Sequence, residues 1–260
     1  MHTDFTRRFR LDGKNALVIG GNGGLGKAIV HAFMASGAAV AVGSRHPDKT
    51  ADEFRAVAAA SGTAYWDAAV DIADEKSVLT MAEMLEREMG HVDILVNAAG
   101  INILKKAEEY DSASFDRVMN INVRGTHLVS REIGRRMIPQ HFGRIINISS
   151  VKGTIGTGQD YIAYCASKGA VNMYTRQLAC EWAKYGITCN AIAPTFVRTP
   201  INSFQLDDPV FYRKLVERIP LGRIGTGEDI ASAAVFLASE AAGFITGQIL
   251  AVDGGLTAMQ

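Results

Sequence analysis

The sequence predicts an α/β fold, a doubly wound parallel sheet of the Rossmann type in a single domain. Short apolar runs alternate with longer stretches whose apolar residues recur at helical spacing, which indicates parallel βαβ units. The chain has 260 residues, 48% of them hydrophobic, which suits one large core better than two small ones. Because no repeat or linker interrupts the pattern, residues 11–260 are expected to form this single domain, after a mobile arm over residues 1–10.

The expected strands are short runs rich in Val, Ile and Ala, and several are followed by glycine or a polar residue. They cover residues 15–20, 38–43, 64–70, 92–97, 144–148, 187–192 and 248–252. The first helix is expected from Leu25 to a glycine cap at Gly37. Further helices are expected at residues 49–60, 75–89, 114–137, 161–184 and 228–238. Residues 195–226 interrupt the rhythm, and so long an irregular stretch is expected to form a lid over the substrate.

Composition argues against several classes of partner. The 27 Lys and Arg balance the 27 Asp and Glu, so charge gives no reason to expect nucleic acid or an anionic membrane. The N-terminus has no apolar signal segment, and no apolar run has membrane-spanning length. The three cysteines lack a pairing pattern, which is typical of reduced thiols and predicts a cytoplasmic protein. The six histidines are scattered, so we expect no metal.

A glycine-rich stretch, GGNGGLG at residues 20–26, follows the first expected strand and opens the first expected helix. Glycines there let the backbone turn sharply and approach a pyrophosphate at the helix N-terminus. A flexible turn is the alternative, and the G-x-x-x-G-x-G spacing differs from the commoner G-x-G-x-x-G. A second small-residue stretch, NAAG at 97–100, ends the fourth strand and leaves room for an adenosine ribose, or forms an ordinary tight turn.

Tyr164 and Lys168 lie four residues apart and therefore share one face of the helix expected at 161–184. A phenol has an ordinary pKa of about 10 and is a poor base near neutrality. A nearby ammonium stabilises the phenolate and lowers that pKa, which makes Tyr164 a candidate acid/base group. Of the seven tyrosines, only Tyr164 has a lysine at this spacing. A chance pair is the alternative, and the positive ring of an oxidised nicotinamide is a second source of stabilisation.

Two further polar features lie near expected strand and helix boundaries. Ser149 and Ser150 follow the strand at 144–148, where a hydroxyl polarises a substrate carbonyl or simply forms a turn. Asn122 lies inside the helix expected at 114–137, a mildly unfavourable place for Asn. It therefore has either a functional role or a solvent-facing side chain.

Taken together, these motifs resemble the classical short-chain dehydrogenase/reductase family, in the branch of gluconate 5-dehydrogenases and 3-oxoacyl reductases. The resemblance covers about residues 11–257. It rests on GGNGGLG at 20–26, Asp71, Ile72, NAAG at 97–100, Asn122, ISS at 148–150, YCASK at 164–168, NAIAPTFVRT at 190–199 and ITGQILAVDGG at 245–255. The resemblance implies an NAD(P)-dependent oxidoreductase that interconverts an alcohol and a ketone, and a homotetramer built on residues 161–184 and 247–256.

The family's catalytic roles carry over to four residues. Tyr164 is implied to protonate the carbonyl oxygen in reduction and to act as the base in oxidation. Lys168 is implied to hold the nicotinamide ribose and to lower the pKa of Tyr164. Ser150, rather than Ser149, matches the residue that orients the carbonyl, because the SVKG sequence that it begins fits the family. Asn122 is implied to support a water chain that leads to Lys168.

The cofactor-binding residues that the motifs and the resemblance imply lie at strand ends and after the sixth strand. They are Gly20, Asn22, Gly24, Leu25, Gly26, Ser44, Arg45, Asp71, Ile72, Asn97, Ala98, Ala99, Gly100, Tyr164, Lys168, Pro194, Thr195, Val197 and Thr199. The chain departs from the family at Ile19, where Thr is frequent, and at Thr195, where Pro-Gly is usual. Thr226-Gly227 replaces a frequent proline. None of these departures removes a catalytic group.

The end of the second strand favours NADP over NAD. An NAD site typically places a carboxylate there for the ribose 2′-hydroxyl, and no acidic residue occurs at 43–45. Arg45 can instead grip a 2′-phosphate with two hydrogen bonds, and Ser44 and Asn22 can donate others. The alternative is that Arg45 is a solvated charge, or stacks on adenine, and that both cofactors bind.

The substrate is predicted from weaker signals. Residues 181–196 resemble the sugar-acid and polyol branch, and a 3-oxoacyl thioester reductase is the alternative. Lys152 and Arg198 flank the expected site and are candidates to bind a carboxylate. Apolar residues of the lid either cover an apolar substrate or pack as its core; they are Phe204, Leu206 and Tyr212. A non-catalytic dinucleotide sensor is the competing class, although a sensor has no need of the four catalytic residues together.

Overall fold

Seven parallel strands form one sheet in the order β3-β2-β1-β4-β5-β6-β7. The computed structural model describes residues 4–158, 160–199 and 203–259. The strands are β1 Asn15–Ile19, β2 Ala39–Ser44, β3 Tyr65–Ala69, β4 Ile94–Asn97, β5 Gly143–Ile148, β6 Ile187–Pro194 and β7 Ile249–Val252. Every strand expected from the sequence is present, which confirms the doubly wound sheet. The order reverses between β1 and β4, and this switch point is where ligands bind in such sheets.

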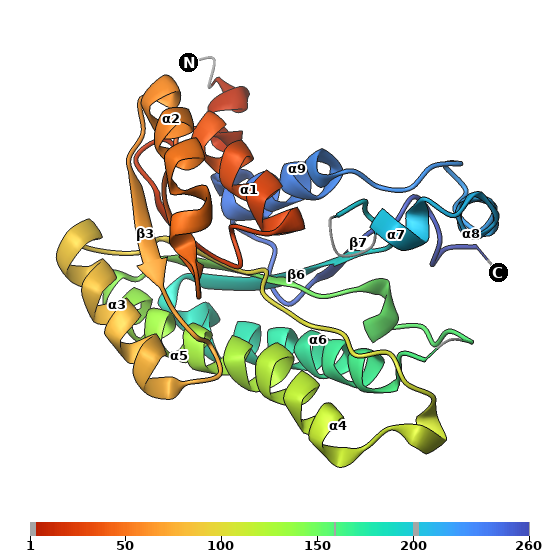
Figure 1. The fold of residues 1–260 in the computed structure, drawn as a ribbon. Helices are drawn as coiled ribbons and strands as arrows, with labels where there is room; N and C mark the ends of the chain where they lie inside the picture. The colour runs from red at the N-terminus through yellow and green to blue at the C-terminus, as the bar shows by residue number, and fades with distance from the viewer. Residues whose placement is uncertain (1–3, 159, 200–202, 260) are drawn as a thin grey trace.

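The helices form two layers, one on each face of the sheet (Figure 1). One layer holds α1 Gly24–Ala35, α2 Ala51–Ser61 and α9 Gly227–Ala238. The other holds α3 Glu75–Met89, α4 Ser112–Met119, α5 Thr126–Met137 and α6 Ile162–Trp182. In the part of the chain that the structure describes, no helix is both long enough and apolar enough to cross a membrane.

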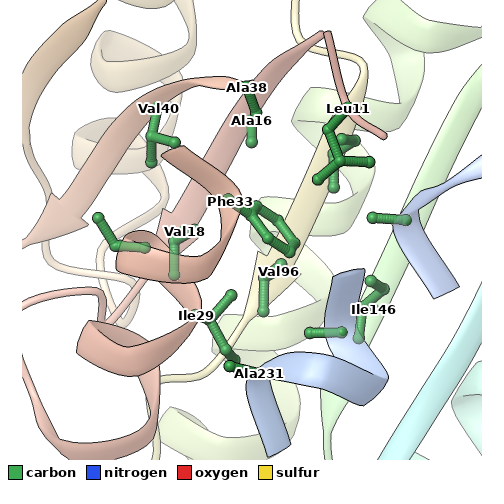
Figure 2. Close-up of a cluster of buried hydrophobic side chains, with 14 of the residues drawn as sticks. Leu11, Ala16, Val18, Ile29, Phe33, Ala38, Val40, Val96, Ile146 and Ala231 are labelled. Atoms are coloured by element: carbon green, nitrogen blue, oxygen red, sulfur yellow. The ribbon is translucent and has the colours of Figure 1, made fainter. Parts of the chain in front are cut away.

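Strand β1 shows how the sheet divides the core. Ala16 and Val18 pack in the cluster with α1 and α9, whereas Leu17 and Ile19 pack in the cluster on the opposite face. This alternation follows from the two-residue period of a strand. Figure 2 shows the first cluster, with Phe33 of α1 lying against the strands. A rigid sheet buried on both faces therefore fixes the ends of its strands, where the site lies.

The helix expected at 114–137 is interrupted. α4 ends at Met119, a π-helical turn follows at Asn120–Gly125, and α5 begins at Thr126. The prediction of one continuous helix was therefore wrong at its centre. A π turn holds one residue more than an α turn, and such turns occur at functional sites. Asn122 lies in this turn and is buried.

The lid region is more regular than expected, because it contains two short helices, α7 Ser203–Leu206 and α8 Pro209–Val216. The Asp208 side chain accepts a hydrogen bond from the Val210 N–H at 2.9 Å and caps α8. A proline in the first turn adds a second start signal, which the prediction of irregular structure overlooked. Lid residues form their own small apolar cluster, which supports the packing alternative for Leu206 and Tyr212. The side chain of Phe204 lies outside the described residues.

The segment expected to be a mobile arm contains a 3₁₀ helix, Phe5–Phe9. The ring of Phe9 stacks on Phe236 of α9 with centroids 6.1 Å apart. The Arg8 guanidinium donates to the Glu240 carbonyl at 3.1 Å. These contacts hold the segment against α9 and the residues that follow it. Residues 1–3 lie outside the described residues, and the mobility of residues 1–10 stays a prediction.

Candidate active site

The glycine-rich turn lies at the carboxyl end of β1, and its shape depends on missing side chains. The Gly20 N–H donates to the Gly43 carbonyl at 2.7 Å. A Cβ on Gly20 would lie 2.8 Å from the Ala99 nitrogen, and one on Gly26 would lie 2.2 Å from the Gly20 carbonyl oxygen. Gly23 caps α1 without any side-chain bond to its first turn. The open N–H groups of that turn fit a pyrophosphate.

The end of β2 gathers three polar residues implied in cofactor binding. The Asn22 amide donates to the His46 carbonyl at 3.1 Å, and the Ser44 hydroxyl accepts from the His46 N–H at 3.2 Å. Arg45 is exposed between them. In the described part of the chain, no carboxylate forms an ion pair with Arg45. This end of the site therefore presents an uncompensated cation to a ligand.

The third strand is followed by the two residues implied to flank the adenine. The Asp71 carboxylate accepts from the Ala73 N–H at 2.9 Å, which forms a tight turn at the surface. Ile72 is buried, and its side chain would lie 2.8 Å from a Cβ on Gly125 of the π turn. The Arg124 guanidinium donates to the Ala73 carbonyl at 2.8 Å. The π turn thus holds the Asp71–Ile72 backbone in place.

Asn97 differs from the other residues implied to bind the cofactor, because its side chain points into the core. Its amide donates to the Ser130 hydroxyl at 3.0 Å and to the Asn147 Oδ1 at 2.9 Å. The side chain is therefore engaged in the core, and a cofactor contact of Asn97 would come from its backbone at the strand end, so its role in cofactor binding stays a prediction. The adjacent Gly100 is different, since a Cβ there would lie 3.3 Å from the Asn122 Oδ1 and 3.6 Å from the Lys168 Nζ. Its small size leaves access to Lys168.

Asn122 is fixed by three hydrogen bonds. Its Oδ1 accepts from the Ile101 N–H at 2.8 Å, and its Nδ2 donates to the Ile101 carbonyl at 2.9 Å. Its Nδ2 also donates to the Ser167 hydroxyl at 3.0 Å. The side chain therefore ties the loop after β4 to α6, the helix that carries Tyr164 and Lys168. The alternative of a solvent-facing Asn122 is wrong.

Tyr164, Lys168 and Ser150 come together at the carboxyl end of β5. The Lys168 Nζ lies 5.6 Å from the centroid of the Tyr164 ring and donates to the Ile148 carbonyl at 2.7 Å. Ser150 forms a hydrogen bond with Tyr164. Ser149 instead donates to the Asn172 Oδ1 at 2.5 Å and faces away from the tyrosine. The preference for Ser150 over Ser149 agrees with this geometry.

Burial dominates the electrostatics of these groups. It raises the pKa of Tyr164 to about 12, against a smaller lowering by the hydrogen bond from Ser150. It lowers the pKa of Lys168 to about 8. The lowering of the Tyr164 pKa expected from Lys168 is thus not found in the protein alone, because burial of the phenol raises that pKa and Lys168 is not among the groups that shift it. A further positive charge beside the ring is needed for Tyr164 to act as a base near neutrality.

The segment after β6 closes the site. The Ser150 hydroxyl is 3.5 Å from the Pro194 carbonyl, and Val197 pairs with Gly225 across the base of the lid. A Cβ on Gly24 would lie 2.8 Å from the Thr199 Cγ2, so this segment lies over the glycine turn. Thr195 is half-buried at the start of the same segment.

The two cations that flank the site differ in their partners. The Arg198 guanidinium already forms an ion pair with Asp207 at 2.7 Å and also donates to the Leu206 carbonyl. The Lys152 Nζ lies 3.1 Å from the centroid of the Tyr161 ring. Tyr161, which the sequence interpretation overlooked, lies 6.2 Å from Tyr164 between ring centroids. Its position one helical turn before Tyr164 was the available signal.

The donor set suits a nucleotide rather than a metal. Within the described ranges, no group of three or more His, Cys, Asp or Glu side chains converges as metal ligands would. Glycine amides at a helix N-terminus, an exposed Arg and a Tyr–Lys pair at the carboxyl end of β5 instead define a nicotinamide-dependent oxidoreductase.

Comparison with known proteins supports that class. Residues 20–257 match the family profile described as Enoyl-(Acyl carrier protein) reductase. Galactitol 2-dehydrogenase (L-tagatose-forming) of Cereibacter sphaeroides is 41% identical over 258 residues, covering 98% of this chain and 99% of that protein. D-threitol dehydrogenase of Mycolicibacterium smegmatis is 41% identical, covering 96% of this chain and 95% of that protein. A crystal structure of gluconate 5-dehydrogenase from Burkholderia cenocepacia, in complex with NADP and tartrate, has a TM-score of 0.93 at 36% identity, covering 98% of this chain and 99% of that one.

The chain belongs to the short-chain dehydrogenase/reductase family, and the resemblance stated from its motifs is confirmed. It is an NAD(P)-dependent oxidoreductase that interconverts an alcohol and a ketone.

Proposed function

We propose that the protein is an NADP-dependent dehydrogenase of sugar acids or polyols, with Tyr164 as its acid/base group. The observation that carries this proposal is the cluster of Ser150, Tyr164 and Lys168 at the carboxyl end of β5, held to the loop after β4 by Asn122. A sensor that only binds dinucleotide has no need of this cluster. The named relatives act on galactitol, threitol and gluconate, which all carry several hydroxyl groups beside the reacting carbon.

The chain's own residues divide the reaction between them. Ser150 donates a hydrogen bond to the carbonyl oxygen and orients it. Tyr164 donates its proton to that oxygen in reduction and removes it in oxidation. Lys168, whose Nζ donates to the Ile148 carbonyl, would hold the nicotinamide ribose and places a positive charge near Tyr164. When bound, the nicotinamide supplies or accepts the hydride and, when oxidised, brings the further positive charge that Tyr164 needs.

Asn122 acts through its neighbours, because its three bonds fix the Ile101 backbone against α6. Its place beside Lys168 and Gly100 suits the water chain that the family resemblance implies. We assign it a positioning role for Lys168.

The preference for NADP rests on the end of β2. Arg45 is exposed without an ion-pair partner among the described residues, and the Ser44 and Asn22 side chains both form hydrogen bonds with the backbone of His46, the next residue. A 2′-phosphate would meet these groups and no carboxylate. The remaining contacts would come from backbone and side chains at the glycine turn and after β6; they are Gly20, Gly24, Leu25, Gly26, Asp71, Ile72, Asn97, Ala98, Ala99, Gly100, Pro194, Thr195, Val197 and Thr199.

A 3-oxoacyl thioester is the second candidate substrate. The matching family profile carries an acyl-carrier name, and an open groove of about 900 Å³ runs along the lid. Leu206, Tyr212 and Ile219 line it, and such apolar walls suit an acyl chain. We place the sugar substrates first because Lys152 and Ser150 make the centre of the site polar, whereas this groove lies beside it.

We also propose a cytoplasmic homotetramer. Ile162 and Met173 of α6 are exposed apolar side chains on the helix that the family uses for assembly, and Phe244 and Leu250 are exposed near the C-terminal segment. Exposed apolar groups of this kind are typical of subunit contacts. Light scattering at micromolar concentration should give four times the 27.9 kDa chain mass, and a monomer would contradict the proposal. Three free cysteines fit a reducing compartment.

A spectrophotometric screen tests the proposed function. Purified protein is incubated with NADP⁺ and D-gluconate, galactitol or D-glucitol, and in the reverse direction with NADPH and acetoacetyl thioester. We expect oxidation of at least one sugar compound, with higher kcat/KM than for the thioester. Activity on the thioester alone would reject the sugar substrates in favour of the second candidate.

A further inference from the structure

Lys152 is placed next to the catalytic serine by local backbone geometry. A 3₁₀ turn, Val151–Gly153, follows β5, and Ser150 is its N-cap. The Lys152 N–H donates to the Ser150 hydroxyl oxygen at 3.2 Å. The backbone of Lys152 is therefore fixed by the hydroxyl that orients the substrate carbonyl, so its side chain starts at the reacting centre.

The side chain of Lys152 extends across an aromatic wall. Its Nζ lies 3.1 Å from the centroid of Tyr161 and 5.6 Å from that of Phe196, which belongs to the segment after β6. Tyr161 in turn packs beside Tyr164. The ammonium thus lies between the start of α6 and the base of the lid, against the ring that packs beside the proposed catalytic tyrosine.

No carboxylate neutralises this ammonium within the described part of the chain. The groups that act on it electrostatically are the Cys165 thiol and the Arg218 guanidinium, and the latter repels it. Burial lowers the pKa of Lys152 to about 8, so the group remains mostly protonated at neutral pH. A desolvated cation without an anion is costly, and aromatic contact offsets only part of that cost.

A ligand anion would complete this arrangement. An ammonium has three donors and a concentrated charge, and it binds a carboxylate more strongly than a neutral hydroxyl. Arg198, the other cation at the site, is already paired with Asp207. Of the two candidates for a substrate carboxylate, Lys152 is therefore the one that remains available.

We propose that Lys152 determines substrate class by binding the carboxylate of a sugar acid while Ser150 and Tyr164 hold the reacting carbinol, an inference that rests on the proposed dehydrogenase function. It selects sugar acids over the uncharged polyols that the same catalytic groups would otherwise accept.

The test compares D-gluconate with D-glucitol, which differ in carrying a carboxylate or a hydroxymethyl group at one end. Three variants are assayed with NADP⁺ beside the wild type. Lys152→Met removes the charge and keeps most of the apolar stem, and Lys152→Arg keeps the charge. Lys184→Met is the matched control, since Lys184 also lies over an aromatic ring, that of Tyr185 at 5.1 Å, but outside the site.

The wild type should favour gluconate, and Lys152→Met should lower the gluconate-to-glucitol ratio of kcat/KM roughly ten- to a hundredfold, as loss of one charge-assisted bond implies. The loss should appear mainly in the KM for gluconate. Lys152→Arg should retain part of the preference, and Lys184→Met should match the wild type.

Two results would overturn the inference while leaving the proposed function intact. One is a wild type that oxidises glucitol in preference to gluconate. The other is a Lys152→Met enzyme that loses activity on both compounds equally, which would indicate a hydroxyl ligand or a structural role. If the wild type oxidises neither compound but reduces acetoacetyl thioester, the proposed function and this inference fail together.

Discussion

The two halves of the sheet build their parts of the site by different means. On the β1–β2 side, the glycine turn at 20–26 depends on the absence of side chains, since a Cβ on Gly26 would lie 2.2 Å from the Gly20 oxygen. On the β5–α6 side, the site depends on side chains, the buried Ser150 and Lys168 and the half-buried Tyr164, held by hydrogen bonds. The β1–β2 side therefore contributes a backbone conformation, and the β5–α6 side contributes side chains with shifted pKa values.

This difference indicates how each half fails. A shape made by backbone is spoiled by adding atoms, and the damage should appear as weaker cofactor binding. A proton-transfer site is spoiled by removing a charge or a hydroxyl, and the damage should appear in turnover. The predictions below separate the two.

The largest effect should follow from Lys168→Met. Removing the ammonium takes away the group proposed to hold the nicotinamide ribose and the cation beside Tyr164, so kcat should fall by roughly 10²–10⁴, the range of acid–base groups. Initial-rate assays with saturating amounts of the best substrate measure this kcat. Lys184→Met, at an exposed lysine in the 3₁₀ turn Ala183–Tyr185 that follows α6, serves as the control. A variant that keeps more than a third of wild-type turnover would contradict the role of Lys168.

Gly26→Ala should act on the other half. The new Cβ must displace the Gly20 backbone, and overpacking of this kind costs about 1–3 kcal/mol, or roughly five- to 150-fold in affinity. Fluorescence titration with NADPH gives the Kd. Gly156→Ala is the matched control, because a Cβ there meets nothing within 4 Å. Unchanged affinity in Gly26→Ala would show that the turn does not approach the pyrophosphate.

The double variant Ser44→Asp, Arg45→Gln tests cofactor choice at the end of β2. It removes the guanidinium and adds a carboxylate that repels a 2′-phosphate. The ratio of kcat/KM for NADPH to that for NADH should fall roughly ten- to a hundredfold and reverse, as loss of a charge-assisted bond implies. Arg87→Gln, an exposed arginine on α3, should leave the ratio unchanged. Equal use of both cofactors by the wild type would refute the NADP preference.

A smaller effect concerns stability. The pKa of Lys168 is about 8 in the folded protein against an ordinary 10.5. Between pH 8 and pH 10.5, Lys168 is protonated in the unfolded chain and deprotonated in the folded chain. The free energy of unfolding therefore rises with pH in this range. Below pH 8 both states are protonated and the full burial penalty remains. The Tm of Lys168→Met should therefore exceed that of the wild type at pH 7, and the gap should narrow by pH 9.5. A constant gap would show that Lys168 does not titrate in this window.

The sequence predicted the sheet because each strand is a short apolar run whose environment is local and repetitive. It also predicted that Ser150, Tyr164 and Lys168 lie together, since Tyr164 and Lys168 share a helix face and Ser150 follows a strand end. The sequence did not predict that the side chain of Asn97 points into the core, where it forms hydrogen bonds with Ser130 and Asn147. Those partners come from α5 and β5, and no local pattern announces such a long-range contact.

Two other departures have the same origin. The π turn at Asn120–Gly125 exists together with the bonds of Asn122 to Ile101 and Ser167, which join three separate segments. The place of the Lys152 ammonium depends on Tyr161, the N-cap residue of α6, and on Phe196, in the segment after β6. The hydrophobic periodicity of a single helix or strand cannot predict contacts between separate segments. The unfavourable position of Asn122 inside an expected helix was nevertheless a signal that this residue has a special role.

The central claim is that Tyr164 transfers the proton, and Tyr164→Phe tests it most directly. Phe keeps the ring and its packing but has no proton to transfer, so kcat should fall by roughly 10²–10⁴. NADPH affinity, measured by the same fluorescence titration, should stay within about threefold, since well under 1 kcal/mol of cofactor contact is lost. A Phe variant with near wild-type turnover would contradict the account, whichever substrate proves to be the best.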